Sequence, residues 1–131
     1  MTVNKERVEL FAQALESGRY RKCSTYLRAV GHYPNGDLVE YNCALGVATH
    51  VALDNGLRQE LPLLRRTEDD LFLGGGLAPP VRRWYGFLFD DPPVVDSEDG
   101  CHDSVTGLND AGRDFWAIAQ ALRAQYLKDE G

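Results

Sequence analysis

The chain has 131 residues, of which 44% are hydrophobic and 26% are charged, so it can bury a core without disulfides or metals. Its formal net charge of −6 opposes binding to nucleic acid, because phosphate repels an acidic surface. No apolar run approaches the roughly 20 residues of a membrane-spanning helix, and no signal peptide opens the chain. We therefore expect one cytoplasmic domain with no membrane or nucleic-acid partner.

An amphipathic helix is predicted over residues 5–17, near the start of the chain. Asn4 suits its N-cap, and Gly18 follows the last turn, where a left-handed residue ends many helices. The apolar side of this helix is formed by residues at helical spacing: Val8, Phe11, Ala12 and Leu15.

A β-hairpin is predicted next, in which the segments TYLRAVG and DLVEYN flank the loop HYPNGD. An Asn-Gly pair between two runs rich in Tyr, Val and Leu is a good hairpin signal, and the loop length leaves the turn type open. The second strand runs into an apolar helix over residues 43–55, which Asn42 can cap and Asn55-Gly56 can end. Since this helix is apolar almost all round, we expect it to be central and buried.

The middle of the chain is predicted to be a loop-rich connection with one short helix, because Pro and Gly break any long period. A further short helix is expected in PPVRRWYGF, with Pro80 near its start and Gly86 at its end. Its buried side chains would be Val81, Trp84 and Tyr85. The following segment DDPPVVDSEDGCHD is acidic and contains prolines, and it is predicted to be exposed.

The C-terminal helix is predicted over residues 115–127, with Asp114 as its N-cap and Gly112 at a positive φ in the preceding turn. Its apolar side is formed by Phe115, Ile118, Ala119, Leu122 and Tyr126. The predicted fold is thus a mostly helical α+β single domain. The central helix would be packed by helices 5–17 and 115–127, with the small hairpin at one side.

Cys43 is the first candidate for chemistry, because a thiol in the first turn of a helix has its thiolate stabilised by the helix dipole. Nucleophilic catalysis also needs a base within hydrogen-bond reach. His50 is about 10 Å away by helical rise, which is too far for direct proton transfer. We interpret Cys43 as a small core residue, with a Cys43-dependent hydrolase or transferase as the less favoured alternative.

A metal site is not predicted. The segment DGCHD contains Cys101 and His102 between two aspartates, but structural zinc needs about four ligands and a second Cys/His pair is missing. The spacing of a calcium-binding loop is also missing, and the triple glycine 74–76 lacks the Lys-Ser/Thr of a phosphate-binding loop. We expect no cofactor.

The arginines offer a possible anion site. Arg28, Arg82 and Arg83 could hold an anionic small molecule such as a nucleotide through paired guanidinium groups, and Trp84 could stack on its base. The alternative is that these arginines are solvated charges that balance an acidic chain.

Two further positions are candidates for binding. Asn109 and Asp110 form an Asn-Asp pair that can shape a turn or contribute a carboxylate to a site. Trp116 lies off the apolar side of its helix, which is typical of a tryptophan that contacts another protein.

Three segments, YNCALGVATHVAL, LAPPVRRWYGF and LNDAGRDFWAIAQAL, together resemble a pattern found in small proteins of actinobacteria and their phages. In those proteins a Cys-Ala-Leu-Gly segment precedes a helix, and Trp-x-Gly and Leu-Asn-Asp-x-Gly segments follow. This chain departs from the pattern at Asn42 and Asp114, both of which can cap a helix. The matching positions are Cys43, Leu45, Gly46, Trp84, Gly86, Leu108, Asn109, Asp110, Gly112, Phe115, Ile118 and Ala119.

The resemblance implies a small phage-associated cytoplasmic protein and supplies no activity. The favoured hypothesis is therefore a non-catalytic accessory protein, encoded by a phage, that binds a host protein. It rests on the lack of a complete catalytic constellation, the acidic surface and the off-face aromatic residues. Binding of an anionic small molecule is the alternative.

Overall fold

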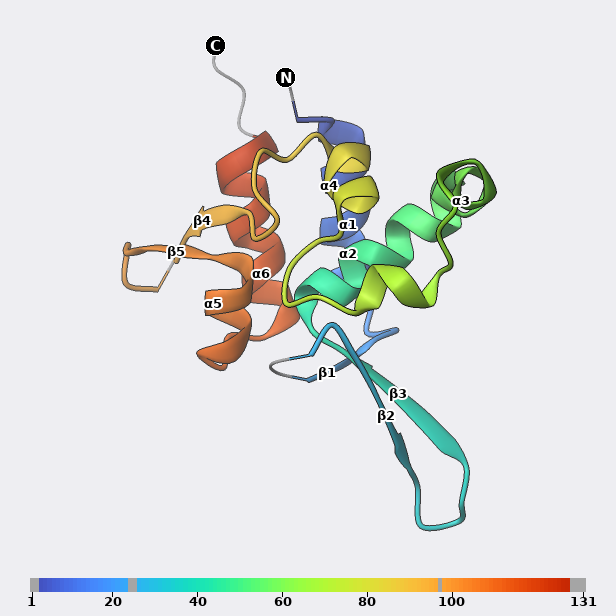
Figure 1. Ribbon diagram of the computed structural model, residues 1–131. Helices are drawn as coiled ribbons and strands as arrows, with labels where there is room; N and C mark the ends of the chain where they lie inside the picture. The colour runs from blue at the N-terminus through green and yellow to red at the C-terminus, as the bar shows by residue number, and fades with distance from the viewer. Residues whose placement is uncertain (1–2, 24–25, 97, 128–131) are drawn as a thin grey trace.

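In the part of the chain that the structure describes, helices predominate and two small β-sheets lie at the periphery (Figure 1). The structure, a computed structural model, describes residues 3–23, 26–96 and 98–127. The predicted α+β class with mostly helical content is confirmed.

The first helix, α1 (Lys5–Glu16), begins where the sequence predicts. The side chain of Asn4 accepts a hydrogen bond from the backbone N–H of Arg7 at 3.1 Å, and Gly18 has a φ of 75°. The predicted apolar residues of α1 are all buried: Val8, Phe11, Ala12 and Leu15.

The larger sheet contains β1 (Arg21–Lys22), β2 (Arg28–His32) and β3 (Leu38–Asn42), in the order β1-β3-β2. Strands β2 and β3 are antiparallel, which confirms the predicted hairpin, although Thr25 of its predicted first strand lies outside the described residues. Strand β1 runs parallel to β3 and was not predicted, because two residues carry no period.

The hairpin turn contains Pro34, Asn35 and Gly36. The N–H of Tyr33 donates to the carbonyl of Asp37 at 2.8 Å, which closes the loop, and Gly36 has a φ of 91°. The Asn-Gly pair therefore occupies a three-residue loop that places the glycine in the left-handed region.

Helix α2 (Ala44–Ala52) is the buried central helix, and it contacts α1, α4 and α5. The predicted cap is wrong: Cys43, not Asn42, is the N-cap residue of α2, and Cys43 makes no side-chain capping bond. The first N–H of α2, that of Ala44, instead donates to the side chain of Asn109 at 3.0 Å. Asn109, which is distant in sequence, therefore accepts the helix N–H that adjacent Asn42 was predicted to accept.

The predicted stop at Asn55-Gly56 is confirmed, because Asn55 and Gly56 leave the helical region within the turn η1 (Leu53–Leu57). Helix α3 (Arg58–Leu64) then begins, followed by the short turn η2 (Asp69–Phe72). Helix α4 (Pro79–Tyr85) ends at Gly86 with a φ of 82°, as predicted. The three side chains predicted to be buried on α4 are buried, namely Val81, Trp84 and Tyr85.

The acidic segment is exposed over residues 98–103, as predicted, but it also contains an antiparallel strand pair that was not predicted, β4 (Pro93–Val95) and β5 (His102–Ser104). Val94 is buried and Asp96 is only 5% exposed, and the guanidinium of Arg113 binds the Asp96 carboxylate at 2.8 Å. Helix α5 (Val105–Asp110) follows, so Asn109 and Asp110 lie in a short helix and not in a turn.

Helix α6 (Phe115–Leu122) continues into the turn η3 (Arg123–Leu127), and the side chain of Asp114 caps it by accepting from the N–H of Ala117 at 2.8 Å. Helix α6 packs mainly against α1 and not against α2. Of the two helices predicted to pack on the central helix α2, only α1 is therefore a main neighbour. Arg123 joins the two helices by binding Glu9 and Glu16 of α1 at 2.9 and 2.6 Å.

Candidate functional site

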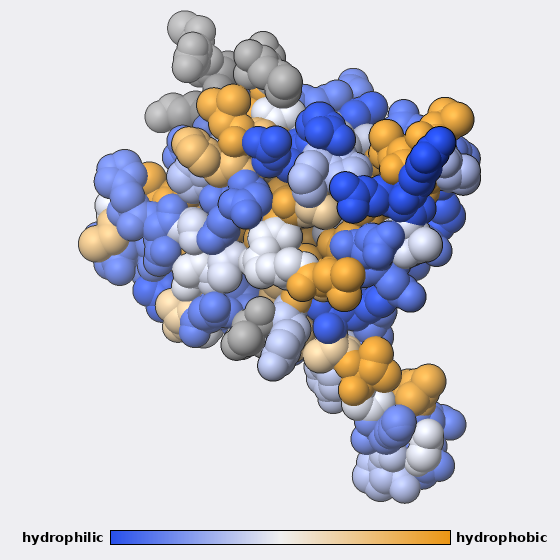
Figure 2. All heavy atoms as spheres, viewed as in Figure 1, coloured by the Kyte–Doolittle hydropathy of each residue, from blue (hydrophilic) through white to orange (hydrophobic). Residues whose placement is uncertain are grey.

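The β2–β3 hairpin projects from the helical body as an arm (Figure 1). We call residues 28–42 the arm. In the space-filling view hydrophobic residues lie on the surface of the arm as well as on the body (Figure 2). Side chains at the base of the arm contact the helical body, whereas side chains further out are exposed to solvent.

Arg28 anchors the base of the arm to η2. Its guanidinium donates to Asp69 at 2.7 Å and lies over the ring of Phe72, 4.3 Å from the ring centroid. A second carboxylate, that of Glu40, is 3.8 Å from Nε of Arg28. The positive charge of Arg28 is thus neutralised where the hairpin leaves the body.

His50 anchors the other strand of the arm to α2. Its Nε2 is 3.1 Å from Oδ1 of Asn42 and 3.4 Å from Oε2 of Glu40. Both partners accept, so Nε2 carries the proton in the neutral ring. Burial lowers the pKa of His50, and the nearby Glu40 carboxylate opposes that shift.

The outer half of the arm exposes apolar side chains. Val30 is 61% exposed and Leu38 is 69% exposed. Val30 pairs with Glu40 and His32 pairs with Leu38, so all four side chains lie on one face of the hairpin. On the opposite face Val39 is buried, and it pairs with Gly31.

Strand β2 has an open edge. The N–H of Cys43 donates to Leu27 and the N–H of Tyr33 donates to Asp37, so odd-numbered residues of this strand bond toward β3. In an antiparallel pair the residues between them point their N–H and C=O groups the other way. The backbone groups of Arg28, Val30 and His32 therefore face outward, and no described strand lies beside them.

This combination of an open edge and exposed apolar side chains suits the addition of a strand from another chain. Unpaired backbone groups of an edge strand form a ready template for pairing, and proteins usually protect such edges with charge, proline or bulges. Val30 carries none of these. Sequence reasoning missed Val30 and Leu38, although the apolar pair Leu38-Val39 already indicated a strand with apolar side chains on both faces.

The structure does not bring all the predicted ligand-binding arginines together. Arg28 lies at the base of the arm, and Arg82 donates to the backbone carbonyl of Leu88 at 3.0 Å. Arg83 and Trp84 do share a pocket of about 250 Å³ with Arg7. Arg7 lies over the Trp84 ring, 4.3 Å from its centroid.

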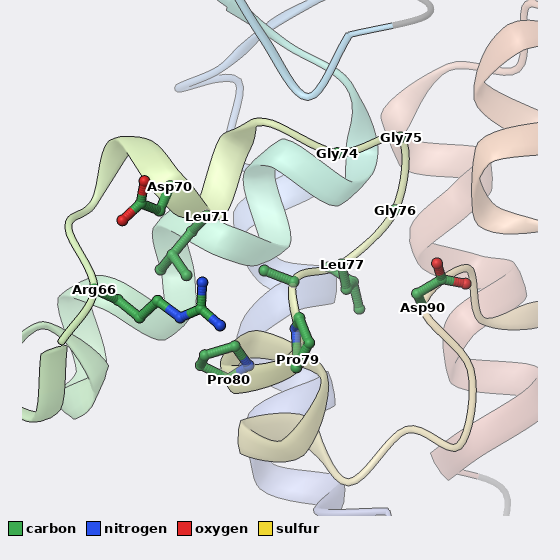
Figure 3. A pocket seen from close by; sticks show the side chains of 11 residues that line it. Arg66, Asp70, Leu71, Gly74, Gly75, Gly76, Leu77, Pro79, Pro80 and Asp90 are labelled. Atoms are coloured by element: carbon green, nitrogen blue, oxygen red, sulfur yellow. The ribbon is translucent and has the colours of Figure 1, made fainter. Parts of the chain in front are cut away.

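A second pocket of about 270 Å³ lies between η2, the triple glycine and the start of α4 (Figure 3). Arg66 extends along it, with Asp70 and Asp90 at either side. One guanidinium against two carboxylates gives the pocket no excess positive charge for an anion. The glycine segment is held by a hydrogen bond from the N–H of Leu77 to the carbonyl of Asp90 at 2.7 Å.

Cys43 is 6% exposed at the N-terminus of α2, which agrees with its interpretation as a core residue. Burial raises the pKa of its thiol to about 11, so the thiol is protonated at neutral pH. His50 lies two turns further along α2, and its Nε2 is already engaged with Asn42 and Glu40, so it does not act as a base for Cys43. These observations do not favour nucleophilic catalysis.

The remaining candidates occupy contrasting environments. Asn109 is fully buried, where its Nδ2 donates to the carbonyl of Cys23 at 2.8 Å and its Oδ1 accepts from Ala44. Asp110, next to it, is exposed. Trp116 is 62% exposed on α6, so its side chain can reach a partner.

Within the described ranges no group of three or more His, Cys, Asp and Glu side chains is placed to hold a metal ion. No described helix combines the length and the apolar character that crossing a membrane requires. No protein-family model, curated protein or solved structure matches this chain.

Proposed function

We propose that this protein is a non-catalytic accessory protein that acts by binding another protein through the arm. The proposal rests on one observation, which is that the unpaired edge of β2 lies beside the exposed side chains of Val30 and Leu38. Because the base of the arm is anchored by Arg28 and His50, the edge is presented in a fixed orientation, which lowers the entropic cost of binding. In a phage-encoded chain the partner is a host protein.

Val30→Pro tests this proposal at one backbone group. The N–H of Val30 faces outward, so proline removes a donor from the open edge and leaves the bonds between β2 and β3 in place. We expect the folded variant to lose the partner. Leu38→Ser removes the neighbouring apolar side chain and should have the same effect.

The measurement is capture from an actinobacterial lysate, compared among four purified proteins with matching circular dichroism. Trp116→Ala and the unaltered chain should retain a polypeptide that Val30→Pro and Leu38→Ser do not retain. Equal retention by all four would contradict binding through the arm. Loss with Trp116→Ala alone would instead place the contact on α6.

A second candidate, binding of an anionic small molecule, is favoured by the pocket that Arg7, Arg83 and Trp84 share. Glu60 also lines this pocket and opposes an anion, so we rank it below protein binding. A nucleotide panel should raise the melting temperature of the unaltered chain and not that of Arg83→Ala. No shift with any nucleotide would remove this candidate.

A further inference from the structure

Two of the cysteines, Cys23 and Cys43, are far apart in sequence, but each comes immediately after a residue of the same strand pair. Lys22 of β1 pairs with Asn42 of β3 in parallel register, and Cys23 and Cys43 come next on each strand. The ladder continues past the last pair, because the N–H of Cys23 donates to the carbonyl of Asn42 at 3.1 Å. Neighbouring strands lie about 4.8 Å apart, and side chains at matching positions point to the same face.

The side chain of Asn109 independently fixes this neighbourhood. Its one amide group donates to the carbonyl of Cys23 at 2.8 Å and accepts from the N–H of Ala44 at 3.0 Å. One side-chain amide therefore bridges the backbone carbonyl of Cys23 and the backbone N–H of Ala44, the residue after Cys43, and this keeps the two segments close together. Burial raises the pKa of both thiols, and smaller contributions raise the pKa of Cys43 through Cys23 and the pKa of each thiol through the carboxylate of Asp110.

We propose that Cys23 and Cys43 form an oxidant-dependent disulfide that links β1 to the N-terminus of α2. Neither cysteine is part of a disulfide in this structure, and the thiol of Cys23 donates to the backbone carbonyl of Tyr26 at 3.2 Å, a bond that oxidation would break. Disulfides need Cα atoms about 4.4 to 6.8 Å apart, a range that contains the spacing of adjacent strands. Cys101, the third cysteine, is exposed on the β4–β5 hairpin and takes no part.

The oxidant is a peroxide, and Cys23 reacts first because it is partly exposed whereas Cys43 is buried. The Cys23 thiolate attacks the peroxide oxygen to give a sulfenic acid, and the leaving oxygen takes up a proton to become water. The Cys43 thiol, which is protonated at rest, then attacks the sulfur of Cys23 and gives up its proton as the S–S bond forms. The hydroxyl group of the sulfenic acid takes up that proton and leaves as a second water. Two thiols are thus oxidised and one hydrogen peroxide is reduced to two waters.

The ring closed by this bond contains the whole arm, since β2 and β3 both lie between residues 23 and 43. Oxidation would therefore tie the base of the arm covalently to the body. The cross-link itself does not depend on the proposed function, and only its effect on partner binding rests on it.

The experiment treats the reduced, full-length chain with hydrogen peroxide, blocks remaining thiols with N-ethylmaleimide and maps tryptic peptides without reduction. The three cysteines fall in separate tryptic peptides, residues 23–28, 29–58 and 84–113. We expect the first two peptides to be joined in the unaltered chain and in Cys101→Ser, and to be separate in Cys23→Ser and Cys43→Ala.

Recovery of the 23–28 and 29–58 peptides only in blocked or over-oxidised form, from protein that stays folded, would overturn the proposal. A bond to Cys101 in place of the expected one would do the same. Because no partner is present, either failure leaves the binding function untouched. The melting temperature of the oxidised chain should also be about 5–10 °C higher than that of the reduced chain. A lower melting temperature would contradict the proposal that Cys23 and Cys43 lie close enough to be joined without strain.

Discussion

Asn109 caps a helix that begins 65 residues before it in the chain, because its side-chain oxygen accepts the N–H of Ala44 at 3.0 Å. Its amide nitrogen meanwhile donates to Cys23 at 2.8 Å. The central helix, the end of β1 and α5 therefore meet at one fully buried side chain.

Replacing Asn109 with Ala should destabilise the protein by about 2–4 kcal/mol, since it leaves two buried backbone groups without partners. Asn4→Ala is the matched control, because Asn4 is an exposed cap of α1 and its loss should cost about 1 kcal/mol. Urea denaturation of both variants gives the comparison. Equal losses would show that burial adds nothing to the cap of α2.

Gly46 permits the close approach of the chain entering β2 to helix α2. A Cβ at Gly46 would overlap the backbone carbonyl of Leu27, which cannot move without shifting the strand. Gly46→Ala should therefore lower the free energy of unfolding by more than about 3 kcal/mol. The same change at Gly107 meets only the side chain of exposed Asp103, so it should change stability by less than about 1 kcal/mol.

Thermal unfolding of the Gly46 and Gly107 variants at one pH tests this difference. A Gly46→Ala protein as stable as the unaltered chain would mean that β2 is free to move away from α2. The arm would then not be fixed at its base.

Leu38 and Val39 are neighbours on β3 that face opposite ways. Leu38 is exposed and Val39 is buried, so Leu38→Ala should change stability by less than about 0.5 kcal/mol, and Val39→Ala should cost about 1–2 kcal/mol. Denaturant titration of the two variants, each checked by circular dichroism, makes the comparison. A large loss with Leu38→Ala would show that its side chain serves the fold and is not free for a partner.

Stability should fall as the pH drops below the ordinary pKa of histidine, because of His50. Burial lowers the pKa of His50 from its ordinary 6.5, so the unfolded chain binds this proton more readily than the folded chain. The contribution of neutral His50 to the free energy of unfolding is complete above pH 6.5. It is lost as the pH falls from 6.5 through the lower pKa that His50 has in the folded protein.

Unfolding free energies measured at about pH 7.5 and about pH 5.5 should therefore differ less in His50→Gln than in the unaltered chain. His102→Gln is the control, because that ring is exposed on β5. An unchanged pH dependence in His50→Gln would assign the effect to another group.

The sequence by itself determined the features whose causes are local. Asn4 and Asp114 cap the helices that they precede, Gly86 ends α4, and the Asn35-Gly36 pair turns the hairpin, because each acts through backbone groups within four residues. Helical spacing likewise predicted the buried side of α1 and, on α6, the buried residues Ile118, Ala119 and Leu122. The predicted Phe115 and Tyr126 are half-buried.

Only the tertiary structure decided which distant groups meet. Asn42 is as good a cap by residue type as Asn109, but the fold turns its side chain toward His50 and brings Asn109 to Ala44 instead. The short strands β1, β4 and β5 have too few residues to show a period, so their pairing depends on the helices that place them.

The open edge of β2 and the neighbouring thiols of Cys23 and Cys43 are likewise products of strand order. No pattern along the chain encodes which edge stays unpaired or which two cysteines become neighbours. Both follow from packing, in which each element takes the position that best buries its own apolar side.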